Sequence, residues 1–467
     1  MVLGCSSAHE DEGKKQEPIL RAPAPEAPIP NGHTIPNKEP DIRIRLDRIR
    51  NRGERVIIGT DEQRLRVTDR HQESLLGAFS GPLEVYLASD GWRLKESSGR
   101  GRVTLPTEEI IVRAATQDTG DSSLLGVQTS TNQPVRKYPG LLRLVPRGDE
   151  PSGSWDLINE VPLESYLPGV LAGELYSGWH PATYDAQAIA ARSYAVNEIL
   201  SRLGRSHFDV ESSVRSQVYL GATNNQEAIK SVERTQGQVL GYEDRLVPGY
   251  YSSCCGGHPA LASEAIGPNP INELEPLNGH GPPAYCDEAT VFHWTRKTNR
   301  HLIEDRLRSF GKQTANELLA KLGQLQSIDT KTVNPFGRAL SMEIKDTQGR
   351  SIVISATQLR RALMRGDAVG GRASLQLLSE NIRLFVDGNV VNIDGWGFGH
   401  GVGLCQFGAQ AMANSGNKAN AIVTFYYPGA TVVSAYSTPE SLTHSTDQNT
   451  EEAQAPNQAQ SPSAQEP

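Results

Sequence analysis

The sequence lacks several signatures that would assign it to common classes of protein. It contains no run of about 18 or more apolar residues, so it predicts no transmembrane helix. It has no stripe of lysine and arginine with interleaved aromatics, which excludes a generally basic nucleic-acid binder. The nucleotide-binding spacing G-x-G-x-x-G is also absent, because Val402 stands where the third glycine, counted from Gly397, is required.

Most of the negative net charge lies at the C-terminal end of the chain. The 467 residues carry a formal net charge of −8, but five acidic residues and no Lys or Arg follow Ala435. The rest of the chain is therefore near neutral, and an acidic substrate must be met by local groups such as Arg192. With 37% apolar residues, the chain can build the cores of two or three ordinary domains.

The two ends have the composition of disordered tethers. Residues 1–40 are rich in Pro, Glu and Ala, and the acidic residues 437–467 lack the apolar side chains that a core needs. The start, VLGCSS, resembles a bacterial lipobox, in which Cys5 would become a lipidated N-terminus. No charged region and no apolar region precede Cys5, so either the true start lies upstream or Cys5 is unrelated to export.

The part between the tethers predicts mixed secondary structure. Residues 41–150 read mainly as short β-strands bounded by Gly, Asp or Ser. Residues 151–436 combine two helices, further strands, a helix-rich stretch over 303–325, a hairpin over 339–354 and a short helix over 356–363. Because regular βαβ alternation is absent, the pattern predicts an α+β fold, with a β-rich first part and a functional core over 151–436.

One carboxylate stands out in an apolar helical pattern. Tyr166, Val170 and Glu174 recur at steps of four, which predicts a helix with the acid at its C-terminal end. Apolar neighbours and the negative helix end favour the protonated form, as a general acid requires. The alternative is an ordinary surface glutamate that ends a helix. Pro181 predicts the start of a second helix, on which Gln187 and Tyr194 share a face.

This segment resembles the core motif of the stage II sporulation protein D family, also known as the LytB amidase-enhancer family. Residues 163–195 follow that motif in register, and further motifs of the family follow in order at 208–210, 217–221, 235–240, 251–258, 396–409 and 426–429. Two positions depart from the family pattern: Asp185 replaces a usual lysine, and Cys405 replaces a usual serine.

The resemblance implies a function in the bacterial cell wall. It implies a glycan-binding cleft and lytic transglycosylase activity on peptidoglycan strands, between N-acetylmuramic acid and N-acetylglucosamine, after the stem peptides have been removed. Glu174 is the implied catalytic residue, and a lone acid suffices if the sugar's own 6-hydroxyl attacks to close a 1,6-anhydro ring. The candidates for substrate binding are Gln187, Arg192, Tyr194, His400 and Gln406.

The glycine-rich segment 395–403 contains one of these candidates, His400, and Gln406 follows it. Its alternating glycines predict an extended stretch with one bare face, against which a backbone or a flat sugar ring can approach closely. His400 would then either bind the substrate or support the helix of Glu174, and Arg192 would either pair with the lactyl carboxylate or orient Glu174.

The cysteines suggest a structural metal site. Cys255 and His258 stand three residues apart in a glycine-rich turn, and Cys286 follows at a spacing that can complete a zinc site, although only three ligands are evident. Members of the family have a similar Cys-Gly-Gly-His turn and a later cysteine, and some of them bind zinc there, so the resemblance implies zinc ligands at Cys255, His258 and Cys286. A disulfide between Cys255 and Cys286, natural in an exported protein, and free thiols are the alternatives.

Two other classes of function compete with the transglycosylase. One is a non-catalytic glycan-binding protein that stimulates a cell-wall amidase, as some relatives are named for doing. The other is zinc-dependent hydrolysis, which a chelator would abolish. Each of these functions predicts an exported protein of the cell envelope, attached to the membrane only through an anchor at Cys5.

Overall fold

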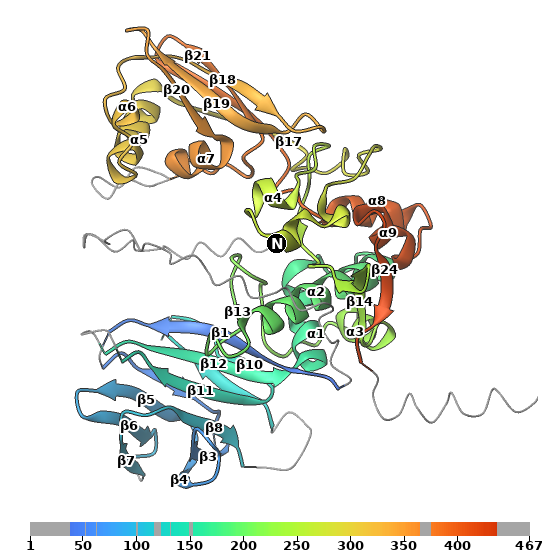
Figure 1. Cartoon of the computed structure of the whole chain (residues 1–467). Helices are drawn as coiled ribbons and strands as arrows, with labels where there is room; N and C mark the ends of the chain where they lie inside the picture. Colours follow the sequence, from blue (N-terminus) through green and yellow to red (C-terminus); the bar gives the residue numbers. More distant parts are fainter. Residues whose placement is uncertain are drawn as a thin grey trace, which may run out of the picture.

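The computed structural model describes residues 38–51, 53–61, 63–99, 101–115, 123–130, 132–148, 153–364 and 375–436. The expectations for the anchor at Cys5, for nearly all of the tether 1–40 and for the tail 437–467 lie outside these residues. The described part is a strand-rich α+β fold, as the sequence predicts (Figure 1). None of its helices has the length and apolar character needed to cross a membrane.

The first part of the chain forms two sheets that share one core. Their strand orders are β13-β1-β12-β11-β8-β3-β4 and β10-β9-β2-β5-β6-β7. Alternate residues of β5, namely Leu83, Val85 and Leu87, are buried, and the rings of Trp92 and Trp155 meet edge to face at 5.1 Å between the two sheets. The strands are β1 (Asp41–Ile49), β2 (Val56–Ile58), β3 (Arg64–Asp69), β4 (Leu75–Ser80), β5 (Leu83–Ala88), β6 (Gly91–Glu96), β7 (Arg102–Leu105), β8 (Ile110–Ala114), β9 (Leu125–Gln128), β10 (Arg136–Tyr138), β11 (Leu141–Pro146), β12 (Trp155–Pro162) and β13 (Val210–Glu211).

The boundary drawn at residue 150 falls inside the first sheet. Strand β12 pairs with β1 on one side and with β11 on the other, so it belongs to the packing unit of residues 41–146. Helix α1 then follows directly from the end of β12. The helix that carries Glu174 is therefore attached directly to the first sheet. A domain boundary at residue 150 would separate β12 and this helix from the sheet to which β12 belongs.

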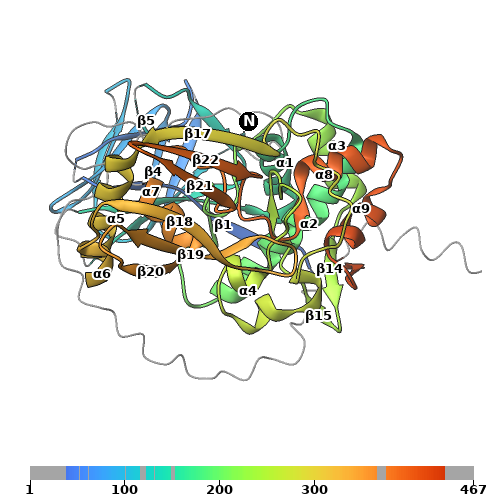
Figure 2. The ribbon, with the colours of Figure 1, turned by 90° about the horizontal axis from the view of Figure 1, so that it is seen from above.

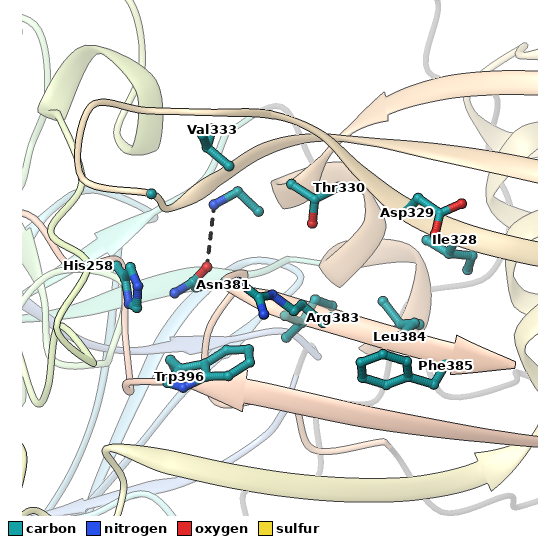
Figure 3. A pocket seen from close by; sticks show the side chains of 13 residues that line it. His258, Ile328, Asp329, Thr330, Val333, Asn381, Arg383, Leu384, Phe385 and Trp396 are labelled. Atoms are coloured by element: carbon teal, nitrogen blue, oxygen red, sulfur yellow. Dashed lines mark hydrogen bonds between the residues drawn. The ribbon is translucent and has the colours of Figure 1, made fainter.

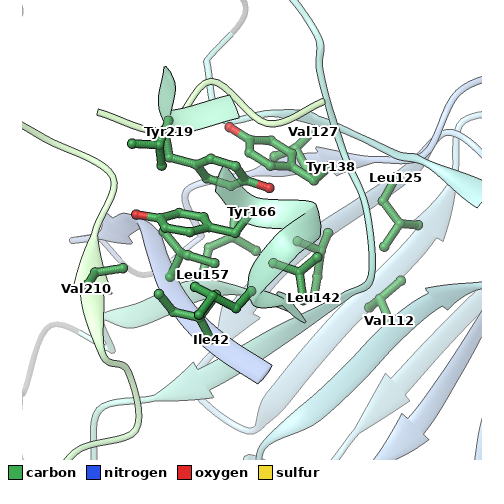
Figure 4. Packing of buried hydrophobic residues seen from close by; sticks show 14 of the residues in the cluster. Ile42, Val112, Leu125, Val127, Tyr138, Leu142, Leu157, Tyr166, Val210 and Tyr219 are labelled. Atoms are coloured by element: carbon green, nitrogen blue, oxygen red, sulfur yellow. The ribbon is translucent and has the colours of Figure 1, made fainter. Parts of the chain in front are cut away.

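Two helices contact the first sheet, and a third packs on both of them. They are α1 (Leu163–Glu174), α2 (Pro181–Arg202) and α3 (Gln226–Arg234), close to the two helices expected from the sequence. Figure 4 shows Tyr166 of α1 beside Tyr219, with ring centroids 4.7 Å apart, above Ile42 and Leu157 of the sheet. A Cβ atom on Gly169 would lie 2.2 Å from the Gly221 carbonyl oxygen, so only glycine lets α1 approach the loop between β13 and α3 this closely.

The centre of the molecule is closed by two segments that are far apart in sequence. Strand β16 (Tyr251–Ser252) pairs in parallel with β23 (Leu404–Cys405), and of the chain between them the part from 293 to 396 forms a separate unit. The remaining elements of this centre are α4 (Ala262–Ala265), the 3₁₀ turns η2 (Pro270–Glu273) and η3 (Glu275–Leu277), β14 (Gln238–Tyr242), β15 (Arg245–Leu246), α8 (Gln406–Asn414), α9 (Ala419–Tyr426) and β24 (Thr431–Ser434).

The unit between β16 and β23 has its own hydrophobic core, so residues 151–436 contain more than one packing unit. Its two sheets have the orders β17-β22-β21 and β18-β19-β20, and β21 lies beside β18 in both views (Figures 1 and 2). The expected hairpin is present, with Lys345 opposite Ser351. The elements are β17 (His293–Asn299), α5 (Arg300–Gln313), α6 (Glu317–Ala320), β18 (Leu325–Val333), β19 (Ala339–Asp346), β20 (Ser351–Ser355), α7 (Ala356–Met364), β21 (Ile382–Asp387) and β22 (Val390–Trp396).

Candidate active site

Glu174 ends α1 in a half-buried position at the centre of the molecule. Its Oε1 accepts a hydrogen bond of 2.8 Å from the backbone N–H of Val218. Burial raises the pKa of its carboxyl group above the ordinary value, and hydrogen bonds from Val218, Gln406 and Tyr251 oppose that rise. The three groups that oppose the rise carry no charge, and no second carboxylate of the described residues is among the causes of the shift.

A chain of side chains orients Tyr251 toward this carboxylate. Gln217 accepts a 3.2 Å hydrogen bond from the Tyr166 hydroxyl and donates a 3.2 Å bond to the Tyr251 oxygen. Since the Tyr251 oxygen already accepts this bond, its own proton is available for Glu174. Burial and the nearby Glu174 carboxylate raise the pKa of Tyr251 well above its usual value, so the phenol stays protonated. Gln217 and Tyr251 were not among the residues expected at the site, although they lie within the family motifs at 217–221 and 251–258.

Backbone atoms of neighbouring residues pack directly against the glycines of the segment 395–403, so the space beside them is not open to a sugar. Gly397, Gly399, Gly401 and Gly403 all have positive φ, so the segment is not extended as expected. A Cβ atom on Gly403 would lie 2.1 Å from the Tyr250 carbonyl oxygen, and one on Gly397 would lie 2.5 Å from that of Cys254. The glycines therefore let this segment cross directly over the residues that follow Tyr250.

His400 is held against the backbone of this crossing. Its Nδ1 accepts a 3.0 Å hydrogen bond from the Val402 N–H, and its ring also contacts the Tyr251 backbone. Burial, together with the positive charge of Arg338, lowers the pKa of His400 to about 4. His400 is therefore neutral at pH 7 and supports the strand that carries Tyr251.

Among the other substrate-binding candidates, Gln406 lies nearest to the acid. It begins α8, it is 3% exposed, and its Nε2 has no hydrogen-bond partner of full geometry although it adjoins Glu174. Tyr194 is half-buried and meets Tyr250 edge to face at 6.1 Å. Gln187 is fully buried, and both polar atoms of its side chain lack partners. Gln187 and Gln406 are thus both closed off from solvent, whereas Tyr194 is half-buried.

Arg192 and Asp185 occupy positions that correct the expectations for them. The Arg192 guanidinium is fully buried and forms two hydrogen bonds with Glu164, of 2.8 and 2.7 Å, so it is not available to a substrate carboxylate. Asp185 pairs with Arg234 of α3 at 2.7 Å, so its negative charge is balanced there. Both charges join helices, and the substrate role expected for Arg192 is wrong because the sequence does not show that Glu164 is its partner.

An aromatic cluster flanks the acid on its exposed side. Tyr176, which is 40% exposed, and the half-buried Trp179 and Phe407 have ring centroids 5.2 to 6.1 Å apart. Tyr176 lies two residues after Glu174, and Phe407 directly follows Gln406. We call Tyr176, Trp179 and Phe407 the aromatic platform. Its rings are tilted against one another by 46° to 69°, and the exposed ring of Tyr176 offers a face on which a flat ligand can stack.

The cysteines form a cluster that differs from the expected ligand set. The Sγ atoms of Cys254, Cys286 and Cys405 lie within 4.8 Å of one another, and Cys255 Sγ lies 3.5 Å from Cys286 Sγ. All four are buried free thiols, so the disulfide considered for Cys255 and Cys286 is not formed in this structure. His258 is not part of the cluster, because its Nδ1 lies 2.8 Å from the Gly256 carbonyl oxygen. Cys254 and Cys405 were not among the expected ligands.

A separate cavity of about 710 Å³ lies between β18 and β21. Figure 3 shows His258 and Trp396 at one end of it and Phe385 at the other, with Arg383 between them. Asn381 Oδ1 in its wall accepts a 3.3 Å hydrogen bond from the Ala339 N–H. Glu174 does not line this cavity, so its access to ligand depends on its half-exposed position beside the aromatic platform.

Comparison with known proteins matches two parts of the chain to family models. Residues 151–242 match a model described as stage II sporulation protein, and residues 283–403 match a domain of unknown function, DUF8618. The first match contains α1, Glu174 and α2, and the second contains the unit inserted between β16 and β23.

Several curated proteins are similar over about 300 residues. An uncharacterised protein of Brachyspira hyodysenteriae is 29% identical over 64% of this chain and 72% of its own length. The stage II sporulation protein D of Bacillus amyloliquefaciens is 28% identical over 60% of this chain and 76% of its own length. The amidase enhancer of Bacillus subtilis is 25% identical over 57% of this chain and 40% of its own length. With the domain match and the relatives in agreement, the chain belongs to the family of stage II sporulation protein D and the LytB amidase enhancer.

Proposed function

We propose that this protein is a lytic transglycosylase that cleaves peptidoglycan glycan strands in the cell envelope. Membership of its family supports a role related to the cell wall. The observation that carries the finer proposal is the lone carboxyl group of Glu174, half-buried, with a raised pKa and uncharged neighbours. A hydrolase of the usual kind needs a second carboxylate at about 5 to 10 Å to activate water or attack the sugar.

A single carboxyl group can perform the reaction if the substrate supplies the nucleophile. Glu174 donates its proton to the bridging oxygen as the bond from that oxygen to C1 of N-acetylmuramic acid breaks. The 6-hydroxyl oxygen of the same sugar then bonds to C1, and its proton passes to the Glu174 carboxylate. The acid is regenerated, no water is consumed, and the product carries a 1,6-anhydro ring.

The neighbours of Glu174 suit both steps of the reaction, the donation of its proton and the return of a proton to its carboxylate. Tyr251 and the Val218 N–H stabilise the carboxylate after it has given up its proton, while burial restores its affinity for the next one. The Gln406 side chain contributes a further hydrogen bond to the Glu174 carboxylate and so helps to orient the acid.

Product analysis tests the proposal directly. The full chain is incubated with glycan strands from which an amidase has removed the stem peptides, and the products are separated and weighed by mass spectrometry. We expect muramic acid ends that are one water lighter than the hydrolytic ends. Hydrolytic ends alone would contradict the mechanism, and their abolition by a chelator would favour the zinc-dependent alternative.

The similarity to an amidase enhancer supports a second candidate, a glycan-binding protein that stimulates a cell-wall amidase without cleaving glycan itself. The aromatic platform would serve such a protein equally well, because binding needs no acid. Wild-type protein that binds stripped strands, raises the rate of an added amidase and never yields anhydro ends would establish this candidate instead.

The aromatic platform gives a binding prediction common to both candidates. Tyr176 is 40% exposed, and its ring makes contacts only with Trp179 and Phe407 among the described ring pairs. Replacing Tyr176 by Ala removes one stacking face worth about 1 kcal/mol, so the Kd for stripped glycan should rise about fivefold in isothermal titration. Phe385→Ala, which removes a ring that is 53% exposed in the separate cavity, is the matched control and should leave the Kd unchanged.

The pH dependence of the reaction gives a further prediction. Because Glu174 acts in its protonated form, kcat/KM should fall as the pH rises through its raised pKa. Tyr251 lowers that pKa by its hydrogen bond, so Tyr251→Phe should move the alkaline limb of the profile to higher pH. Tyr194→Phe is the control, since Tyr194 is not among the groups that shift the pKa of Glu174, and an equal displacement in both variants would contradict this assignment.

A further inference from the structure

We propose that Cys254, Cys255, Cys286 and Cys405 together bind one zinc ion in a closed, structural site of four thiolates. The ligands come from three segments: the turn after β16, the loop that precedes β17, and the junction of β23 with α8. The turn and the junction also carry residues that surround Glu174, but the proposal does not depend on the reaction that Glu174 performs.

The thiol geometry fits such an ion. Around zinc with Zn–S bonds of about 2.3 Å, tetrahedral sulfur atoms lie about 3.8 Å apart. The Sγ atoms of Cys254, Cys286 and Cys405 are all within 4.8 Å of one another, and Cys255 Sγ is 3.5 Å from Cys286 Sγ and also interacts with the Cys405 thiol. Cys255 Sγ does not lie within 4.8 Å of all three other sulfur atoms, so its side chain must move toward Cys254 and Cys405 for the four thiols to share one centre.

Backbone N–H groups already point at the sulfur atoms. The Cys255 N–H donates to Cys405 Sγ at 3.3 Å, and the Gly257 N–H donates to the Cys286 thiol. The positive φ of Gly256 and Gly257, 66° and 75°, turns the backbone so that this is achieved within a short loop. Backbone donors placed in this way can serve as hydrogen-bond partners to sulfur atoms that a metal ion holds.

A buried cation, Arg338, lies close to the site and offsets part of its negative charge. Zinc with four thiolates carries a net charge of −2, and Arg338 lies buried beside the loop, donating to the His258 carbonyl oxygen at 3.0 Å. The thiolate form of Cys255 interacts favourably with this guanidinium. Glu380, 3.8 Å from Arg338, offsets part of that positive charge. A buried anionic centre is costly without such a partner.

The structure assigns His258 a different place. Its Nδ1 contacts the Gly256 carbonyl oxygen at 2.8 Å, and its ring lines the cavity near Trp396 (Figure 3). Cys405, which stands where the family motif has serine, takes the position that a histidine would otherwise have to fill. Four protein ligands leave no open position for water, so the site holds the chain together and does not catalyse hydrolysis.

The ligand positions give the ion a defined structural task. Cys405 is the residue before Gln406 and α8, and Cys254 follows β16, which carries Tyr251. An ion shared by both segments fixes the parallel pair β16 and β23, and with it the two side chains that adjoin Glu174.

Metal content and coordination test the inference on the full chain, purified without chelator. We expect one zinc ion per chain by native mass spectrometry, and X-ray absorption should give four sulfur neighbours at about 2.3 Å with no nitrogen. Cys405→Ser should lose the zinc or bind it at least tenfold more weakly in competition with a chromophoric chelator. The matched control His258→Ala should keep both the zinc and the four-sulfur spectrum.

Three results would overturn the proposal. Zinc lost in His258→Ala but kept in Cys405→Ser would restore the ligand set of Cys255, His258 and Cys286. Wild-type protein without metal and with two disulfides, detected as a mass lower by four hydrogens, would show an oxidised cluster. A spectrum of wild-type protein with nitrogen in the first shell would exclude four thiolates even if the cysteine variants fail to fold.

Discussion

Glu174→Gln is expected to lower the rate of anhydro-product formation by about a thousandfold, the usual contribution of a general acid and base. Glutamine keeps the size of the side chain and can still accept the hydrogen bond from the Val218 N–H, but it cannot give a proton to the leaving oxygen. The rate is measured on stripped glycan strands by counting anhydro ends with time.

The control is Glu233→Gln, which makes the same change on the exposed side of α3 and should leave the rate unchanged. Binding of stripped strands should persist in Glu174→Gln within a few-fold, because the aromatic platform is intact. Equal activity in wild type and Glu174→Gln would remove Glu174 from the mechanism, whereas loss of binding would point to a misfolded variant.

Stability provides an independent readout of the same substitution. Since burial raises the pKa of Glu174, ionisation of the carboxyl group is less favourable in the folded than in the unfolded state. Its contribution to stability is therefore fully present below the unfolded pKa and is lost as the pH rises through the folded pKa. Glu174→Gln should be at least as stable as wild type at neutral pH, and its advantage should vanish in acid.

Arg192→Ala is expected to lower the free energy of unfolding by about 3 to 5 kcal/mol. Arg192 is fully buried and Glu164 is 12% exposed in the pair, so removal of the guanidinium leaves a carboxylate nearly out of water without its charge partner. Arg192 also donates to the Gln238 carbonyl oxygen at 3.2 Å, which links α2 to β14. Urea denaturation followed by circular dichroism measures the change.

The matched control lies on the same helix. Arg202 pairs with Glu198 at 3.1 Å, but its side chain is 37% exposed, so Arg202→Ala should cost less than about 1 kcal/mol. A stable Arg192→Ala protein that binds glycan at least tenfold more weakly would instead support the substrate role expected from the sequence. Glu164→Gln should reproduce the stability loss, because it leaves the buried guanidinium unpaired.

The sequence by itself determined the local elements and the candidate acid. Short-range patterns place α1 and α2, the hairpin of β19 and β20, and α7 within a few residues of their observed bounds. The spacing of Tyr166, Val170 and Glu174 also identified the acid at the end of α1. Such features depend on neighbours within one or two helical turns or one hairpin, which the order of residues specifies directly.

Tertiary structure decided which polar groups meet the acid and which meet one another. Tyr251 and Gln406 reach Glu174 from 77 and 232 residues away, and Arg192 is buried by Glu164 and by β14. Cys405 joins the thiol cluster across 150 residues from Cys255. Residue order leaves the partner of a charge or thiol at such separations open, because the packing of sheets and helices selects it from many chemically equivalent side chains.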